Sequence, residues 1–503
     1  MSGRRAVKLG SSVGLERKKW KIPAGLWLHV RVSATASALV AAAVILASAD
    51  SWPRFRGPNG TGIGTESPLP ARFSATENLI WRTALPPGHS SPVLSESHVF
   101  LTAADGDALL TIALERKTGT IAWQARAERP RQQAVDKRNH PASPTPATDG
   151  QNAYVFFQDV GLLAYDQGGR ERWRVPLGPF ANAYGMGASP IVVGDLVVLV
   201  CDQSAGSFMI AVDRGSGAIR WRVERPEATS GHSTPVIMER PGRAPELLVP
   251  GSFYLTAYEL ATGKKLWWSG GLAFEMKATP VHDGTTVFIS GTSTSSFEDS
   301  YGRNIPDFDD VRSFDKNGDE RFSREELPDD LARRWIRLLD LDGDSLLDRK
   351  EWTRYREARR NAGGLWAFRA GGDGDMTGRN TAWHYDRAIP QLPSPLLYRG
   401  LLYIVNDGGI LTAFDPTSGK VAGQRRLHQA TDSYYASPVA ADGKILFVSE
   451  SGKVSVVKAG ADLEVLAVND LGDLAYATPA LADGRIYVRT RGALYCFGVK
   501  RES

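Results

Sequence analysis

The sequence contains little cysteine, and its two cysteines lie far apart. Cys201 and Cys496 are the only cysteines in 503 residues, and no CxxC or CxxCH motif occurs. A disulfide framework, a zinc ribbon and covalently attached c-type haem are therefore unsupported. We expect two buried free thiols rather than a bridge.

A basic surface is also lacking once the first 49 residues are set aside. The whole chain has a net charge of +4, but residues 1–49 hold eight basic side chains and one acidic side chain. Residues 50–503 carry 52 basic and 55 acidic side chains, a net charge of −3. We therefore expect no nucleic-acid partner, because nucleic-acid binding requires a basic footprint.

The apolar run near the start, residues 34–46, is short and rich in alanine, which argues against a membrane-spanning helix. It follows a basic stretch that ends at Arg31 and precedes Ala47-Ser48-Ala49, an A-x-A cleavage site. Residues 1–49 are therefore predicted to be a signal peptide, and the protein to be periplasmic or secreted. Two alternatives stay open. Arg4-Arg5 would serve a twin-arginine signal, and an uncleaved leader would anchor the protein to a membrane.

Turn residues are abundant, with 51 glycines and 29 prolines, and one motif repeats. A small residue followed by proline recurs eight times, with intervals of 54, 44, 45, 45, 115, 43 and 41 residues between prolines. The eight motifs are Ser91-Pro92, Thr145-Pro146, Ser189-Pro190, Thr234-Pro235, Thr279-Pro280, Ser394-Pro395, Ser437-Pro438 and Thr478-Pro479. Apart from one long interval, the spacing matches a four-stranded propeller blade. We therefore predict an all-β, eight-bladed β-propeller.

Most repeats place a tryptophan four residues after a turn glycine. These tryptophans are Trp123, Trp173, Trp221 and Trp267, with Trp383 expected at the same place in blade five and Gly423 in blade six. One large aromatic at a fixed strand position is expected to pack between neighbouring blades. The strand around Leu79–Thr83 is predicted to complete the last blade, because a closed ring leaves no exposed sheet edge.

Two further patterns resemble a known family. The pattern A-x-[DE]-x-x-[ST]-G-x-x-x-W, at Ala211–Trp221 and Ala257–Trp267, resembles the tryptophan-docking repeat of quinoprotein (PQQ-type) propellers. The segment Trp52–Gly60 resembles the opening of many exported bacterial PQQ-like propeller proteins. The resemblance covers roughly residues 52–292 and 362–500 and implies the fold. It leaves activity open, because such propellers include both dehydrogenases and non-catalytic scaffolds.

The long interval contains an acidic insert in blade five. Two twelve-residue segments, Asp315–Glu326 and Asp340–Glu351, match the EF-hand loop, in which oxygen ligands for Ca²⁺ occupy positions 1, 3, 5, 7, 9 and 12. The candidate ligands are Asp315, Asn317, Asp319, Arg321 (backbone carbonyl), Ser323 and Glu326, then Asp340, Asp342, Asp344, Leu346 (backbone carbonyl), Asp348 and Glu351. The competing interpretation is a pair of acidic turns that binds nothing.

The loops depart from the motif at position 6, which is normally glycine. Glu320 and Ser345 stand there, so a side chain at positive φ is expected to lower calcium affinity without abolishing it. Position 8 is apolar in both loops, and Phe322 and Leu347 are predicted to form the short strands that pair the hands. A helix is predicted over 329–339. We expect calcium to brace the insert rather than to switch it.

The predicted organisation has five parts. They are a signal peptide over 1–49, an N-terminal extension over 50–78, the first propeller part over 79–292, a small α-helical EF-hand insertion in blade 5 over 293–362, and the remaining blades over 363–500.

The residues three positions before each repeated proline are predicted to lie at the mouth of the central channel. They are His89, Ser143, Gly187, His232, Lys277, Leu392, Tyr435 and Tyr476, with Arg138 and His140 close by. Of these, His89, His232, Lys277, Tyr435 and Tyr476 form a candidate site for an anionic or aromatic ligand. The alternative is a solvated rim without a ligand. Spacing alone indicates no Ser-His-Asp or paired-carboxylate arrangement, so no catalytic residue is assigned.

Two functions remain after these observations. The first is an exported calcium-binding propeller that acts as a non-catalytic scaffold for a protein or glycan partner. The second is a PQQ-dependent oxidoreductase. The resemblance implies that such a dehydrogenase would carry a vicinal disulfide against the quinone, a nearby calcium held by Glu and Asn, and an Asp base. Since the sequence has no adjacent cysteines and no match to those residues, PQQ is not favoured as a cofactor.

Overall fold

The computed structural model describes residues 51–292, 304–329, 340, 344–361 and 363–499. The chain divides into two units, Met1–Ser48 and Ala49–Ser503, and the following description concerns the second. The predicted signal peptide, nearly all of the helix predicted over 329–339, and Asp342 lie outside the described residues. In the described ranges, no helix is both long enough and apolar enough to cross a membrane.

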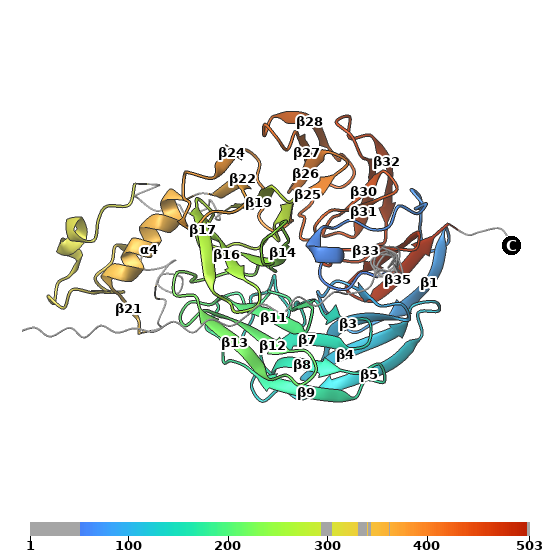
Figure 1. Cartoon of the computed structure of the whole chain (residues 1–503), viewed down its shortest axis with the longest axis horizontal. Coiled ribbons are helices and arrows are strands. Elements are labelled where there is room, and N and C mark those ends of the chain that lie inside the picture. The colour runs from blue at the N-terminus through green and yellow to red at the C-terminus, as the bar shows by residue number, and fades with distance from the viewer. Residues whose placement is uncertain (1–50, 293–303, 330–339, 341–343, 362, 500–503) are drawn as a thin grey trace, which may run out of the picture. The chain divides into compact units, whose positions relative to one another are not determined.

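Eight antiparallel sheets surround a common centre and form the eight blades of a propeller (Figure 1). Blades one and two contain β2 (Val93–Leu94), β3 (His98–Asp105), β4 (Ala108–Glu115), β5 (Ile121–Ala127), β6 (Ala147–Thr148), β7 (Ala153–Phe157), β8 (Gly161–Tyr165) and β9 (Glu171–Pro176). Blades three and four contain β10 (Ile191–Val193), β11 (Leu196–Cys201), β12 (Phe208–Asp213), β13 (Ile219–Glu224), β14 (Val236–Met238), β15 (Glu246–Pro250), β16 (Tyr254–Glu259) and β17 (Lys265–Gly270).

The second half of the ring follows the same order. Blades five and six contain β18 (Val281–His282), β19 (Thr286–Thr292), β22 (Gly363–Arg369), β24 (Thr381–Tyr385), β25 (Leu396–Tyr398), β26 (Leu401–Asn406), β27 (Ile410–Phe414) and β28 (Val421–Arg426). Blades seven and eight contain β29 (Val439–Ala441), β30 (Lys444–Val448), β31 (Lys453–Lys458), β32 (Val465–Asp470), β33 (Ala480–Ala482), β34 (Arg485–Arg489), β35 (Ala493–Gly498) and β1 (Leu79–Ala84). The predicted eight-bladed, all-β architecture is confirmed.

The N-terminal strand closes the ring, as the sequence predicts. Strand β1 pairs antiparallel with β35, so Trp81 lies opposite Cys496. This pairing gives the last blade its fourth strand and leaves the ring without an open sheet edge between its first and last blades. Cys201 and Cys496 are both free and buried, which confirms the expectation of two unbridged thiols.

The small residue before each repeated proline links one blade to the next. In seven of the eight steps, its backbone N–H donates to the side-chain hydroxyl of its counterpart in the following blade, at 2.9–3.2 Å. We call the eight residues the hydroxyl belt: Ser91, Thr145, Ser189, Thr234, Thr279, Ser394, Ser437 and Thr478. The belt encircles the channel and explains why the repeated residue carries a hydroxyl group.

The repeated tryptophans pack between blades, as predicted. Five indole N–H groups donate to a backbone carbonyl in the turn of the next blade, from Trp81, Trp123, Trp173, Trp221 and Trp383. Trp267 instead donates to the Glu246 carboxylate at 3.0 Å. There, β23 (Gly374–Asp375) pairs in parallel with β17 and gives blade four a fifth strand.

The segment before β1 crosses the centre of the propeller. Trp52 forms a β-bridge with Leu94 of blade one, and Ile63 forms one with Ala440 of blade seven. Between them, the 3₁₀ turn η1 (Pro58–Gly60) appears as the blue turn near the centre of Figure 1. Residues 52–63 therefore cross the central channel instead of following its rim.

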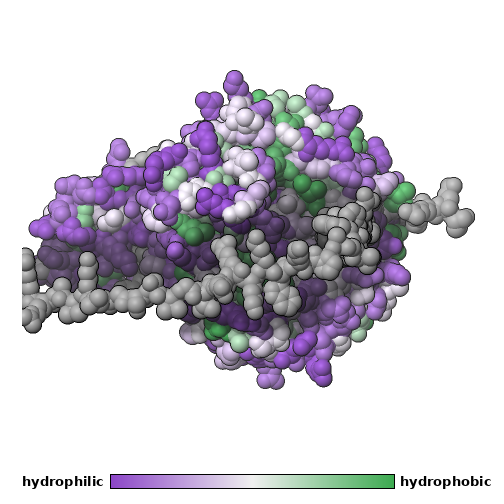
Figure 2. Space-filling view, in the orientation of Figure 1, coloured by the Kyte–Doolittle hydropathy of each residue, from purple (hydrophilic) through white to green (hydrophobic). Residues whose placement is uncertain are grey.

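The insert leaves blade five between β19 and β22. Its described elements are η2 (Asp309–Phe314), β20 (Phe322–Ser323), β21 (Leu346–Leu347) and α4 (Arg349–Arg360). A small aromatic core holds them together, in which the Phe322 ring lies 5.6 Å from Trp352. On the face seen in Figure 2, the side chains over this insert are mainly hydrophilic.

Candidate functional site

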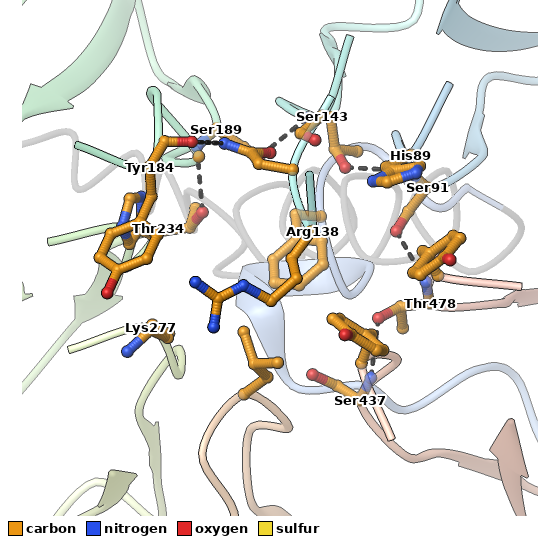
Figure 3. A pocket seen from close by; sticks show the side chains of 18 of the residues that line it. His89, Ser91, Arg138, Ser143, Tyr184, Ser189, Thr234, Lys277, Ser437 and Thr478 are labelled. Carbon is orange, nitrogen blue, oxygen red and sulfur yellow. Dashed lines mark hydrogen bonds between the residues drawn. The ribbon is translucent and has the colours of Figure 1, made fainter. Parts of the chain in front are cut away.

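One cavity of about 230 Å³ lies at the mouth of the central channel (Figure 3). All eight residues predicted there line it, including the candidate ligand-site residues His89, His232, Lys277, Tyr435 and Tyr476. Arg138 also lines the cavity, whereas His140 does not. The periodic spacing in sequence therefore brings residues from all eight blades to one place, because each stands three positions before the belt proline of its own blade.

One side of the cavity is an aromatic wall. The His89 ring stacks on Tyr476 with centroids 4.2 Å apart, and Tyr435 meets Tyr476 edge-on at 5.0 Å. The His140 ring lies behind, 5.1 Å from His89. This wall offers flat faces on which a ring or a sugar can stack.

The two histidines of this wall are neutral. Burial, together with the neighbouring His140 and Arg489, lowers the pKa of His89 to about 3. Burial, together with Arg489 and Arg491, likewise lowers the pKa of His140 to about 4. At neutral pH both rings are therefore uncharged and able to accept or donate single hydrogen bonds.

The opposite side of the cavity carries charges that already have partners. The Lys277 ammonium lies 2.7 Å from the Glu275 carboxylate, and His232 Nε2 lies 3.4 Å from it. Burial alone would raise the pKa of Glu275, but Lys277 and His232 outweigh burial and lower it. Arg138 pairs with Asp136 at 2.7 Å. The cavity is therefore nearly balanced in charge.

Several lining residues were missed by the sequence analysis. Asp136, Tyr184 and Glu275 line the cavity from loops whose length varies between blades, so no fixed spacing points to them. Glu275 stands two residues before Lys277, which was the one available signal. Phe55 arrives from the segment that crosses the channel, and no repeat predicts it.

The groups present do not fit the features implied for a quinone dehydrogenase. Cys201 and Cys496 are separate buried thiols, and neither lines the cavity. Glu275 is held by an ammonium group where a calcium ion would need its oxygens. The amide of Asn139 is also engaged, since its nitrogen donates to the Tyr184 carbonyl at 2.8 Å and its oxygen accepts from the His140 N–H at 2.8 Å.

The two acidic loops of the insert share three hydrogen bonds at equivalent positions. The position 1 carboxylate accepts from the position 6 N–H at 2.9 Å, in Asp315–Glu320 and in Asp340–Ser345. The position 5 carboxylate accepts from the position 7 N–H at 2.9 Å in both loops. The position 12 glutamate accepts from the position 9 N–H, at 2.8 Å for Glu326 and 3.0 Å for Glu351.

Two sequence expectations about these loops can be compared with the backbone. The position 6 residues Glu320 and Ser345 have φ of 60° and 67°, the left-handed region where glycine is normally preferred. The position 8 residues Phe322 and Leu347 pair across the short antiparallel sheet β20–β21. Both features agree with the expectations drawn from the sequence.

The described residues include only some of the remaining candidate ligands. Asp342 lies outside the described residues, as does most of the chain between the loops. Asp344 of the second loop forms an ion pair with Arg321 of the first at 2.8 Å. Among the described residues, no three His, Cys, Asp or Glu side chains converge as a preassembled metal cluster.

Comparisons with known proteins agree with this architecture. The sequence matches the family described as outer membrane protein assembly factor BamB over residues 69–233, 167–313 and 355–502. A curated relative, the serine/threonine-protein kinase AfsK of Streptomyces griseus, is 33% identical over 121 residues, which are 22% of this chain and 14% of that protein. The chain thus spans only a small part of that relative's length.

Similar solved structures share the fold at low sequence identity. BamB from Moraxella catarrhalis is 15% identical with a TM-score of 0.50, covering 84% of this chain and 99% of that one. A europium-containing methanol dehydrogenase is 12% identical with a TM-score of 0.54, covering 91% and 100%. The quinohemoprotein alcohol dehydrogenase from Comamonas testosteroni is 13% identical with a TM-score of 0.55, covering 92% and 83%.

These structural likenesses establish the fold alone, because their identities are low. The family match extends over most of both propeller segments, including the last blade. The chain therefore belongs to the family described as outer membrane protein assembly factor BamB, with the quinoprotein-like β-propeller fold.

Proposed function

We propose that this protein is an exported, calcium-binding β-propeller that acts as a non-catalytic binding scaffold. Calcium binding is supported by three hydrogen bonds that occur at equivalent positions in the two acidic loops of the insert. Two unrelated acidic turns would not be expected to share these bonds at positions 1, 5 and 12. A pair of EF-hand loops accounts for all three.

The candidate calcium ligands are hard oxygen atoms. In the first loop, N–H groups of Ser323 and Lys316, with the Ser323 hydroxyl, lower the pKa of Glu326 to about 2, so this carboxylate is ionised at neutral pH. Calcium prefers six to eight oxygen ligands and tolerates irregular geometry. The twelve positions from Asp315 to Glu326 and from Asp340 to Glu351 supply that number to each of two ions.

Calcium is proposed to brace the insert rather than to signal. The insert has a small apolar core around Phe322, Leu347 and Trp352, which alone gives a short segment limited stability. A bound ion would join the chain at both ends of each loop. In a periplasmic or secreted location, dissociation constants of roughly 10⁻⁴ to 10⁻³ M suffice for this role.

The scaffold part of the proposal rests on the channel-mouth cavity. Its carboxylates Asp136 and Glu275 are bonded to cationic side chains, which leaves no free general base among them. Its aromatic wall and paired charges are suited to binding a protein loop or a glycan.

The alternative is a PQQ-dependent oxidoreductase. One observation favours it: the stacked His89 and Tyr476 rings offer a flat face inside a cavity on the propeller axis. The engaged Glu275 and Asn139 side chains argue against a calcium ion beside a quinone in this cavity. We therefore place catalysis second.

Terbium luminescence tests the calcium proposal directly. Trp352 lies in the insert's core, 5.6 Å from the position 8 residue Phe322, so its excitation should sensitise terbium bound in the loops. We expect saturable terbium emission that added calcium displaces. The double variant Asp315→Ala/Asp340→Ala should lose this emission, whereas Asp195→Ala, an exposed propeller carboxylate, should retain it.

A second variant distinguishes a protein that no longer binds the metal ion from one that has only lost the indole ring that sensitises terbium. Trp352→Phe should remove the emission while calorimetric calcium binding persists. Absence of displaceable emission from the wild-type protein, together with absence of calcium heat, would refute the proposed loops.

A further inference from the structure

We propose that Arg54, Arg56 and Thr279 form a binding site for a small inorganic anion, such as chloride, at the centre of the propeller. The proposal is independent of the calcium loops and of the scaffold function. It rests on the N-terminal segment that crosses the channel and on the one step at which the hydroxyl belt is interrupted.

The two arginines are anchored on either side of blade five. Arg54 Nη2 donates to the Pro235 carbonyl of blade four, and Arg56 Nη2 donates to the Pro395 carbonyl of blade six at 2.8 Å. These prolines directly follow belt residues. The belt residue between them around the ring is Thr279 of blade five, so the guanidinium groups flank it.

Several buried donors in this region lack a partner among the described residues. Arg54 is 4% exposed and Arg56 is fully buried. Arg54 Nε, Arg56 Nε and Arg56 Nη1 are buried with no hydrogen-bond partner from residues 51–292, 304–329, 340, 344–361 and 363–499. Buried N–H groups without acceptors are rare and costly, and those on a charged group are the most costly.

Within the part of the chain that the structure describes, neither guanidinium is paired with a carboxylate. Burial lowers the pKa of each to about 9, so both remain charged at neutral pH, and no nearby acid contributes to either shift. Another fully buried arginine of this chain, Arg225, is instead paired with Asp202 at 2.7 Å. Two buried positive charges without a counter-charge are strongly unfavourable, and a bound anion would supply that charge.

The hydroxyl belt is interrupted beside these charges. Seven belt hydroxyls accept an N–H from the preceding blade, but Thr279 Oγ1 is buried and has no partner in the described part of the chain. A Cβ on Gly60 would lie 3.1 Å from the Thr279 methyl group and 3.6 Å from Arg54 Nη2, so the η1 turn brings these two side chains close together. The free hydroxyl is therefore available as a third donor to an anion.

The position of Phe55 sets this site apart from the cavity at the channel mouth. Phe55 lies between the two arginines in sequence, and its side chain lines the cavity, whereas neither arginine does. The unpartnered donors therefore belong to a region separate from the lining of that cavity. Close packing around Gly60 and Gly62 favours a single small ion over a large organic anion.

Bromide crystallography on the wild-type protein provides the direct test. Crystals of the mature protein grown with sodium bromide in place of chloride should show one ordered anomalous peak within hydrogen-bonding distance of Arg54 or Arg56. Only water density at these nitrogens, or bromide only at surface positions, would overturn the proposal. This test needs no variant to fold.

Thermal unfolding in solution gives a second measurement. The melting temperature should rise and saturate as bromide replaces gluconate at constant ionic strength. Thr279→Val should weaken the apparent bromide affinity about tenfold, the loss expected for one hydrogen bond to a charged group. The control Thr412→Val, a buried threonine on β27, should leave that affinity unchanged. A melting temperature insensitive to bromide, or an unchanged affinity in Thr279→Val, would contradict the assignment.

Discussion

The backbone N–H of Thr478, in the last blade, donates to the hydroxyl of Ser91, in the first blade, at 3.0 Å. This bond closes the hydroxyl belt across the two ends of the propeller, 387 residues apart in sequence. It joins blade eight to blade one on the inner side of the ring, while the pairing of β1 with β35 completes blade eight further out. Two contacts therefore close the ring, one at its inner side and one further from the centre.

We predict that removing one belt hydroxyl destabilises the propeller. Thr145→Val leaves the buried N–H of Ser91 without its acceptor, so the free energy of unfolding should fall by about 1–3 kcal/mol. Thr145→Ser keeps the hydroxyl and should cost less than about 1 kcal/mol. Guanidinium unfolding of both variants measures the difference, and equal losses would show that the hydroxyl is not what matters.

We predict that Gly423 cannot carry a side chain, although tryptophan stands at the equivalent position in other blades. A Cβ on Gly423 would lie 1.8 Å from the Ala461 carbonyl oxygen, because the next blade's turn fills the space. Gly423→Ala should lower the free energy of unfolding by about 1–3 kcal/mol. Gly168→Ala, whose Cβ would have only an ordinary contact at 3.5 Å, is the matched control in thermal unfolding.

We predict that glycine at position 6 strengthens calcium binding. Glu320 and Ser345 both have positive φ, which costs a residue with a side chain on the order of 1 kcal/mol. Glu320→Gly and Ser345→Gly should each raise the affinity of their own loop by about fivefold in calorimetry. Lys316→Gly, at position 2 of the first loop, should bring no such gain. Unchanged affinities in both position 6 variants would indicate that the strain is relieved elsewhere.

We predict that stability falls as the pH drops from 7 to 5. The pKa values of His89 and His140 in the folded protein are about 3 and 4, below the ordinary value near 6.5. The unfolded chain therefore binds protons first, and folding is penalised as pH falls below 6.5. The free energy of unfolding should drop by roughly 4 kcal/mol more in the wild-type protein than in His89→Gln/His140→Gln, about 2 kcal/mol for each ring. Parallel pH profiles would contradict the buried, neutral state of these rings.

The fold and the channel mouth were predictable because they depend on a repeat. Most blades repeat the small residue and proline at a spacing of 41 to 45 residues, so a position in the repeat, as between Pro146 and Pro190, predicts a position in the ring. This is why Lys277 and Tyr476, 199 positions apart, were both expected at the cavity that they line. The role of the belt hydroxyls was not predicted, since a small residue before proline is compatible with many turns.

What the sequence did not predict comes from segments outside the repeat. Phe55 reaches the cavity, and Arg54 the centre of the ring, through a stretch that has no counterpart in other blades. Glu275 lies on an irregular loop, where a carboxylate most often faces solvent. Long-range placement of this kind follows from tertiary contacts, to which neither periodicity nor local propensity is sensitive.

Calorimetric titration of the mature protein, first with calcium and then with PQQ in the calcium-loaded state, is the direct test of a calcium-braced, non-catalytic propeller. We expect calcium heat at two sites, lost in Asp315→Ala/Asp340→Ala, and no heat on adding PQQ. Saturable PQQ binding at one site would contradict the non-catalytic scaffold and favour the oxidoreductase. Absence of calcium heat would contradict the bracing role of the insert.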